Sequence, residues 1–217
     1  MRKENRVYYF SVEGETEKWY LDWLQKTINA VPLAKYNVKL DAKIQKDPLA
    51  RAKGLSILGR TEITHIFDRE SEEEIHVKQF QETLDRMKAV QRTGKQITYK
   101  LGYSNFTFEL WIILHKMDCN GPLTNRYQYL SPLNRAYGET FENLDQYKHE
   151  DNFKRILNKL TIENVREAIR RADKIMQNNR DVGYVQQQYK GYKYYKENPA
   201  LSIGEQIEKI MKECGLM

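Results

Sequence analysis

The first hundred residues of the chain alternate between short apolar runs typical of buried strands and longer segments with helical periodicity. Asp47 and Pro48 suit the N-cap and the first turn of one of these helices. This alternation predicts a mostly parallel sheet with helices on both faces, and therefore a chain of the α/β class. The expected strands cover residues 6–12, 36–44, 63–67 and 96–101, and the expected helices cover residues 15–30, 49–58 and 74–91.

The segment after the fourth expected strand predicts a buried helix. Ser104 or Asn105 is expected to cap it, and it is apolar on most faces up to His115. Glu109 lies within it, and a buried carboxylate must be paired, liganded or protonated. Glu109 is therefore interpreted either as a catalytic residue of the site or as the partner of a core lysine or arginine. His115 is interpreted as a hydrogen-bonded core residue.

Beyond residue 118 the chain is expected to be mainly helical. Gly121-Pro122 and Ser131-Pro132 indicate loops. Amphipathic helices are expected over residues 152–159, 163–177 and 201–214, with a loop over residues 179–198. We therefore expect an α/β core formed by residues 1–118. A helical C-terminal part, residues 119–217, is expected to pack on it in a single compact unit.

Charge and apolar content limit the class of protein. The net charge of +6 is compatible with a polyanionic partner and does not require one. No run of eighteen apolar residues and no signal-peptide pattern is present, so we expect a cytoplasmic protein with no membrane partner. Cys119 and Cys214 lie far apart, and we expect both to be reduced thiols.

Two acidic clusters follow two of the expected strands. Glu13 and Glu17 come after the first strand, and Asp68 and Glu70 come after the third. The carboxyl ends of neighbouring parallel strands meet at one sheet edge, which is where open α/β sheets bind ligands. Crowded carboxylates repel each other, and a hard cation such as Mg²⁺ or Mn²⁺ removes that cost. The alternative is that the glutamates stabilise a helix N-terminus and that the aspartate forms a surface ion pair.

A basic, tyrosine-rich segment lies near the C-terminus and contains no acidic residue between residues 184 and 196. Tyr192 can stack on a base, while Lys190, Lys193 and Lys196 can neutralise phosphates. The segment therefore predicts a contact with nucleic acid. The alternative is a loop whose tyrosines pack on helices while its lysines stay solvated.

Several motifs together carry a resemblance that spans nearly the whole chain. They are Glu13-Gly14-Glu15-Thr16-Glu17 with Tyr20, Phe67-Asp68-Arg69, Ser104-Asn105, Phe108-Glu109-Leu110-Trp111, Leu114-His115 and Asn198-Pro199. With them the chain resembles the RloB-like family, which is associated with restriction loci and with abortive-infection systems such as AbiL. The glutamate-glycine turn and the Asp-x-acid pattern are similar to those of the Toprim superfamily.

The resemblance implies a Toprim-like fold, divalent-metal chemistry on DNA or RNA, a role in phage defence and an ATPase partner protein. It assigns Glu13 as the acid–base or metal-binding glutamate, and Asp68 and Glu70 as metal ligands. The chain departs from the family pattern at Glu70, where aspartate is usual, and at Phe106, where proline is usual.

The residues and the resemblance together favour a metal-dependent phosphodiester hydrolase that uses Mg²⁺ or Mn²⁺. Glu13 is expected to act as general base or acid, with Glu17 and Glu109 as further catalytic candidates. One alternative is a non-catalytic subunit that senses a nucleotide or a nucleic acid. Another is a structural partner with a degenerate acidic site, and a homo-oligomer stays open.

Overall fold

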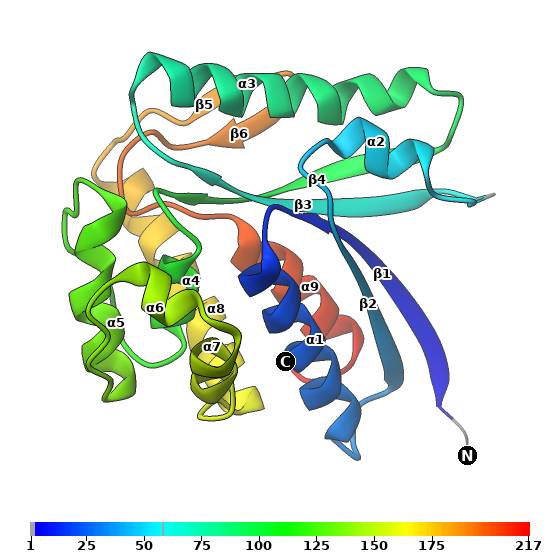
Figure 1. The fold of residues 1–217 in the computed structure, drawn as a ribbon. Coiled ribbons are helices and arrows are strands. Elements are labelled where there is room, and N and C mark those ends of the chain that lie inside the picture. Colours follow the sequence, from blue (N-terminus) through cyan, green and yellow to red (C-terminus); the bar gives the residue numbers. More distant parts are fainter. Residues whose placement is uncertain (1–2, 58) are drawn as a thin grey trace.

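The computed structural model describes residues 3–57 and 59–217. Its main sheet has the strand order β2-β1-β3-β4, and every neighbouring pair is parallel (Figure 1). This confirms the predicted α/β class. The strands are β1 (Glu4–Val12), β2 (Tyr36–Ile44), β3 (Thr61–Arg69) and β4 (Ile97–Asn105).

Helices connect the strands as the alternation predicts. Asp47 caps the second of them by accepting a hydrogen bond from the Leu49 amide at 2.9 Å. That helix is shorter than expected, because the chain leaves it at Gly54. The connecting helices are α1 (Glu15–Ala30), α2 (Pro48–Lys53) and α3 (Glu74–Ala89), which is followed by the short 3-10 helix η1 (Val90–Arg92).

The fourth strand is longer than predicted, and this corrects the expected helix cap. β4 stays paired with β3 as far as Arg69 opposite Asn105, so Ser104 and Asn105 belong to the strand and cap no helix. The chain then turns at Phe106, whose φ is 63°. Helix α4 (Glu109–Leu114) follows, so Glu109 is its first residue and does not lie in its interior.

The C-terminal half contains short helices that the sequence pattern did not predict. Ser131-Pro132, expected in a loop, lies in the first turn of α5, where a proline costs no helical hydrogen bond. Residues 179–198, also expected as a loop, contain the end of α8 and a hairpin, which turns at Lys190 and Gly191 with positive φ angles. The elements are η2 (Arg126–Tyr129), α5 (Leu130–Tyr137), α6 (Leu144–Lys148), α7 (Glu150–Leu157), α8 (Ile162–Asp181), β5 (Gln187–Tyr189), β6 (Tyr192–Tyr194) and α9 (Ile203–Glu213).

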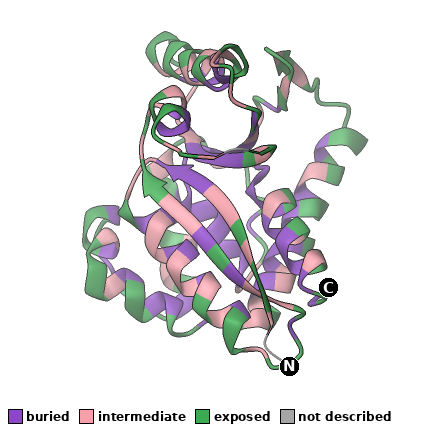
Figure 2. Cartoon of the chain, turned by 90° about the vertical axis from the view of Figure 1, so that its right-hand side faces the viewer, coloured by how far each residue is buried: buried purple, intermediate pink, exposed green. Residues whose placement is uncertain are grey.

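Two apolar clusters fill the two faces of the sheet. The larger joins β1 and β2 to α1, α4 and the C-terminal helices, and the smaller joins β3 and β4 to α2, α3 and the hairpin. Figure 2 shows buried residues concentrated along the strands and on the helix faces turned towards them.

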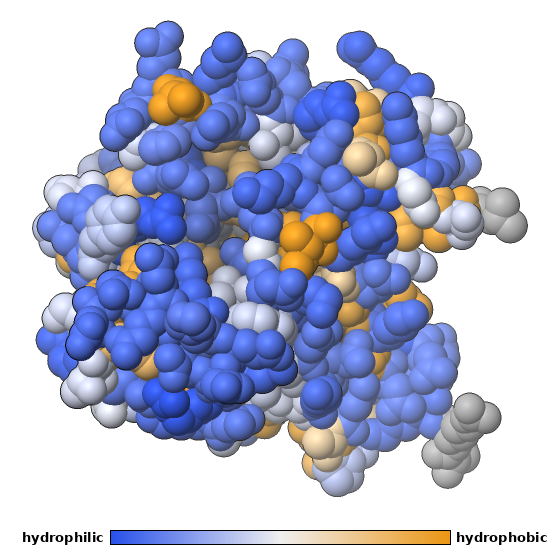
Figure 3. All heavy atoms as spheres, viewed as in Figure 1, coloured by the Kyte–Doolittle hydropathy of each residue, from blue (hydrophilic) through white to orange (hydrophobic). Residues whose placement is uncertain are grey.

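The outer surface is largely hydrophilic on the face shown in Figure 3. Across the described residues, no helix combines the length and the apolar character that crossing a bilayer would require. Cys119 and Cys214 are both buried and are not bonded to each other.

Candidate active site

The structure brings Glu13 and Asp68 together at the carboxyl edge of the sheet. β1 and β3 are neighbours, with Val12 opposite Ile66. The residues that follow therefore lie side by side. A side-chain oxygen of Glu13 accepts a hydrogen bond from the Asp68 backbone amide at 3.4 Å.

Glu17 is held in the same place by the start of α1. Gly14 precedes the helix in an extended conformation, and a methyl group there would lie 3.2 Å from the Glu17 carboxylate. Glycine therefore leaves room for Glu17 to turn back towards the sheet. The side chain of Glu17 is buried, with 6% exposure, and accepts a hydrogen bond from the Thr16 hydroxyl at 3.1 Å.

The buried carboxylates oppose each other's ionisation. Burial raises the pKa of Asp68 well above its ordinary value, and the nearby charges of Glu17, Glu109 and Glu13 raise it further. Burial is also the main reason why the pKa of Glu13 rises to about 7 and why the pKa of Glu17 is raised. We name this group, Glu13, Glu17, Asp68 and Glu109, the acidic crevice.

The pKa of Glu13 predicts a loss of stability with rising pH. The folded protein holds the Glu13 proton up to about pH 7, whereas the ordinary glutamate pKa is 4.5. The free energy of unfolding should therefore fall between these pH values, by about 3 kcal/mol at most. Glu13→Gln should remove most of this fall in urea unfolding measured from pH 4 to 8.

Glu15 offers the matched control, because it lies in the same turn and is exposed. Glu15→Gln should leave the slope of stability against pH as it is in the wild type. The raised pKa of Glu13 would be contradicted if the free energy of unfolding of the wild type rose from pH 5 to 7 and that of Glu13→Gln rose in the same way.

Glu109 forms the ion pair that was one of its two interpretations, and it also lies among the other carboxylates. It is fully buried, and its carboxylate pairs with the Lys148 ammonium at 3.2 Å and accepts a hydrogen bond from Thr107. Its charge also raises the pKa of Asp68 and Glu17. Glu109 is therefore both an ion-pair partner and part of the acidic crevice.

Lys148 is a residue of the candidate site that sequence reasoning missed. It ends α6, a short helix in a region expected to contain loops. Burial acts to lower the pKa of Lys148, but the charges of Glu109 and Asp68 outweigh it, so the pKa is raised and the cation is retained. Its side chain is 32% exposed, whereas the Glu109 side chain with which it pairs is fully buried.

Glu70 lies apart from Asp68: Asp68 is still paired in β3, whereas Glu70 is the first residue after the strand. Its carboxylate is 3.2 Å from His76 and 4.0 Å from Arg126, and its side chain is 42% exposed. The Glu70 charge reaches Glu13, whose pKa it raises slightly. These contacts with His76 and Arg126 place the Glu70 carboxylate at the rim of the crevice, away from a shared ion with Asp68.

The donor atoms of the crevice suit a hard cation, but they do not form a finished site. Within residues 3–57 and 59–217, no three histidine, cysteine or acidic side chains converge at metal-ligand spacing. The crevice offers carboxylate oxygens, which Mg²⁺ and Mn²⁺ prefer. Two buried hydroxyls also lack a hydrogen-bond partner: that of Ser104, opposite Asp68 in the sheet, and that of Tyr147, beside Lys148. The chemistry therefore fits a cation, and the side chains would have to draw together around it.

His115 is a hydrogen-bonded core residue, as interpreted from the sequence. Its ring nitrogens lie 2.9 Å from the Trp111 carbonyl and 3.1 Å from the Tyr20 hydroxyl. Burial lowers the pKa of His115 to about 4, so the ring stays neutral. It does not take part in the crevice.

The basic C-terminal segment forms the β5–β6 hairpin, and none of its residues belongs to the acidic crevice. Tyr192 packs against the smaller apolar cluster, and Lys190 pairs with Asp85 at 3.2 Å. Lys193 and Lys196 are exposed. The predicted contact with nucleic acid therefore stays a prediction for the two exposed lysines.

Three motif residues hold the segment between the hairpin and α9. The Asn105 amide group donates to the carbonyls of Tyr195, Lys196 and Glu197 at 3.2, 3.2 and 2.7 Å. Arg69 donates to the Lys196 carbonyl at 3.1 Å. Asn198 donates to Leu123 and accepts from Tyr129, each at 2.9 Å. These motif positions are therefore structural and lie beside the crevice.

Removing the Asn105 amide should destabilise the protein. Asn105→Ala leaves the carbonyls of Tyr195, Lys196 and Glu197 without this buried donor, which we expect to cost about 2–3 kcal/mol in urea unfolding. Asn105→Asp should cost at least as much, because its carboxylate would face carbonyl oxygens. Asn120→Ala, at an exposed asparagine, should change stability by less than about 0.5 kcal/mol. Equal effects at the two positions would contradict this role.

Comparison with known proteins gives one family. The model of the family described as RloB-like protein matches residues 8–210, which includes every residue of the acidic crevice. No curated protein and no solved structure matches the chain.

Proposed function

We propose that this chain, which belongs to the RloB-like family, is a metal-dependent phosphodiester hydrolase that acts on nucleic acid. The observation that carries the proposal is the acidic crevice. Four carboxylates lie partly or fully buried at the carboxyl edge of a parallel sheet, where ligands bind in this class of fold. Such crowding costs stability, and a bound cation would offset that cost.

The proposed cation is Mg²⁺ or Mn²⁺, which when bound would polarise a phosphate and lower the pKa of its water. Asp68 and Glu13 would hold it, with Glu17 as a further oxygen donor. Glu70 would support the site from the rim, because His76 and Arg126 hold its carboxylate there.

The chain's own side chains would supply the proton transfer and a positive charge. Without a cation the pKa of Glu13 is about 7, and a cation beside it would lower this pKa, so Glu13 would be ionised near neutral pH and could accept a proton. Lys148 keeps its charge between Glu109 and the opening of the crevice. It can therefore contact a phosphate oxygen of the substrate and stabilise charge that develops there.

The wider role rests on the family resemblance. The four-stranded parallel sheet flanked by helices is consistent with a Toprim-like fold. We propose a cytoplasmic role in phage defence, of the abortive-infection kind, together with an ATPase partner. The absence of a Gly-x-x-x-x-Gly-Lys-Ser/Thr loop in this sequence supports a separate ATPase.

A cleavage assay tests the activity. Labelled single- and double-stranded DNA and RNA would be incubated with the protein and Mn²⁺, with and without a candidate ATPase partner. We expect cleavage that EDTA stops and that Glu13→Gln lowers by about 100-fold, while Glu15→Gln retains it. Cleavage that survives in EDTA, or equally in both variants, would overturn the proposal.

A second candidate is a subunit that binds a nucleotide or a nucleic-acid end without cleaving it. Two observations favour it: the Glu70 carboxylate is in contact with His76 and Arg126, and no three histidine, cysteine or acidic side chains of the described residues converge at metal-ligand spacing. This candidate predicts that Mn²⁺ and nucleic acid bind while no product forms under any condition of the same assay.

A further inference from the structure

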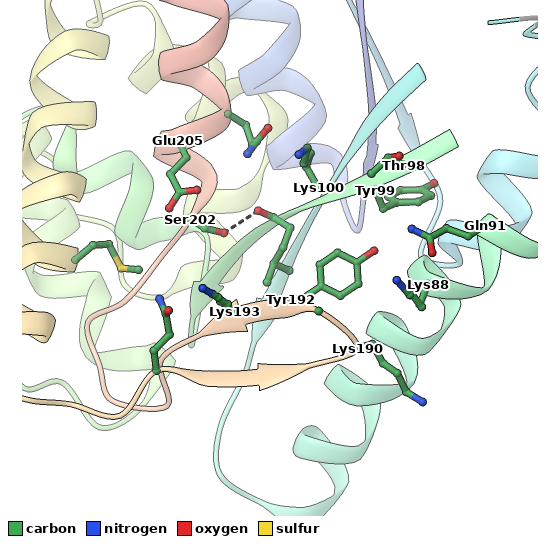
Figure 4. A pocket seen from close by; sticks show the side chains of 15 residues that line it. Lys88, Gln91, Thr98, Tyr99, Lys100, Lys190, Tyr192, Lys193, Ser202 and Glu205 are labelled. Atoms are coloured by element: carbon green, nitrogen blue, oxygen red, sulfur yellow. Dashed lines mark hydrogen bonds between the residues drawn. The ribbon is translucent and has the colours of Figure 1, made fainter. Parts of the chain in front are cut away.

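A cavity lies at the open edge of β4, away from the acidic crevice. Its volume is about 480 Å³, within the range of pockets that hold small ligands. Its walls are the middle of β4, the end of α3 with η1, the hairpin and the first turn of α9 (Figure 4). None of the four crevice carboxylates lines it.

The cavity is cationic. Lys88, Lys100 and Lys193 line it, and Lys88 and Lys193 have no ion-pair partner among the described residues. Lys100 pairs with Glu62 at 3.3 Å, at the border of the cavity. Glu205 is the one carboxylate among the described lining residues. An anion entering the cavity would therefore meet two unneutralised ammonium groups.

The lining also offers neutral contacts. In Figure 4 the Tyr192 ring lies between the side chains of Lys88 and Lys193. The Leu101 carbonyl accepts a hydrogen bond from Ser202 at 2.8 Å, so this residue directs its backbone groups towards the open edge. The Leu101 amide, which lies on the same side of the strand, can then donate to a ligand. Gln91 adds a side-chain amide to the wall.

We propose that this cavity binds a small ligand that carries two or three linked phosphates, of the size of a nucleotide. Two free lysines and a backbone amide suit a compact anion, because charge-assisted hydrogen bonds to phosphate are strong. An aromatic ring between the lysines suits a base or a sugar attached to it.

The surroundings favour a compact ligand over a nucleic-acid strand. A strand needs a continuous basic groove that follows its backbone. Here the basic surface is interrupted, because Lys190 is paired with Asp85 and Lys100 with Glu62. The two free lysines therefore form an isolated site.

Calorimetry in EDTA and low salt tests the proposal. EDTA removes divalent metal, so no phosphate can bind through a cation in the acidic crevice. Any binding that is measured is therefore independent of the proposed hydrolase activity. The probes are sodium tripolyphosphate, ATP and a short single-stranded oligonucleotide. The variant is Lys88→Gln/Lys193→Gln, and its control is Lys26→Gln/Lys39→Gln, at exposed lysines on α1 and on the opposite edge strand β2.

We expect saturable binding of tripolyphosphate or ATP, weakened about tenfold or more in the cavity variant and unchanged in the control. Equal affinity for the two probes would show recognition of phosphates alone, and tighter binding of ATP would add contacts to the nucleoside. Either result supports the proposal. It is overturned if neither probe binds, if the control variant weakens binding equally, or if the oligonucleotide alone binds.

Discussion

Asp68→Asn is expected to lower metal-dependent cleavage by about 100-fold or more and, at the same time, to make the folded protein more stable at pH 8. Asp68 is the most strongly perturbed carboxylate of the crevice, because burial and the charges of Glu17, Glu109 and Glu13 all raise its pKa. At pH 8 the folded wild type must either ionise this group at a cost or hold a proton on it. Asparagine has the same shape and carries no charge, so it removes that cost.

The opposite signs of the two effects make this prediction informative. A substitution that merely damages the fold lowers activity and stability together. The measurements are cleavage rates with Mn²⁺ and urea unfolding at pH 8 without metal. Asp151→Asn, at an exposed aspartate of α7, should change neither. The placement of Asp68 in a crowded acidic crevice would be contradicted if Asp68→Asn were less stable than the wild type at pH 8. It would also be contradicted if Asp68→Asn cleaved as fast as the wild type.

Lys148→Met is expected to destabilise the protein by about 3 kcal/mol, because it leaves the fully buried Glu109 without its cation. This loss is at the lower end of what removing one partner of a buried ion pair costs, because the Lys148 side chain is partly exposed. Glu109→Gln on its own should cost less, because Lys148 can turn to solvent.

The double variant Glu109→Gln/Lys148→Met should recover most of the loss, because it leaves no buried charge. Urea unfolding of the four proteins gives the coupling energy of the pair directly. Lys154→Met, which breaks an exposed i,i+4 pair with Glu150, should cost less than about 1 kcal/mol. Equal losses in Lys148→Met and Lys154→Met, or no recovery in the double variant, would contradict the account of Glu109.

The sequence predicts the parallel sheet well, because its strands are short apolar runs between amphipathic helices. β2 begins and ends where the pattern places it, at Tyr36 and Ile44, and α1 at Glu15 and Ala30. The end of β4 could not be read from the pattern. Ser104 and Asn105 are typical helix caps, but pairing with β3 and contacts from Ala200 and Ser202 keep them in the strand.

The candidate site is only partly predictable for a similar reason. Glu13 follows β1 and Asp68 lies near the end of the neighbouring strand β3, so local pattern and sheet order are enough to bring them together. Lys148 lies thirty-nine positions after Glu109, on a short helix with no periodic signal of its own, and only tertiary packing joins the two. The pairing of Glu70 with His76 and Arg126 likewise depends on how η2 and α3 approach the rim.

The central claim, that the acidic crevice binds a divalent cation, is tested most directly by calorimetric titration of Mn²⁺ at pH 8. It needs neither the substrate nor the partner protein. The account predicts saturable binding to the wild type and to Glu15→Gln, and binding at least about tenfold weaker in Asp68→Asn and Glu13→Gln. Absence of saturable binding to the wild type, or equal affinity in Asp68→Asn, would contradict it.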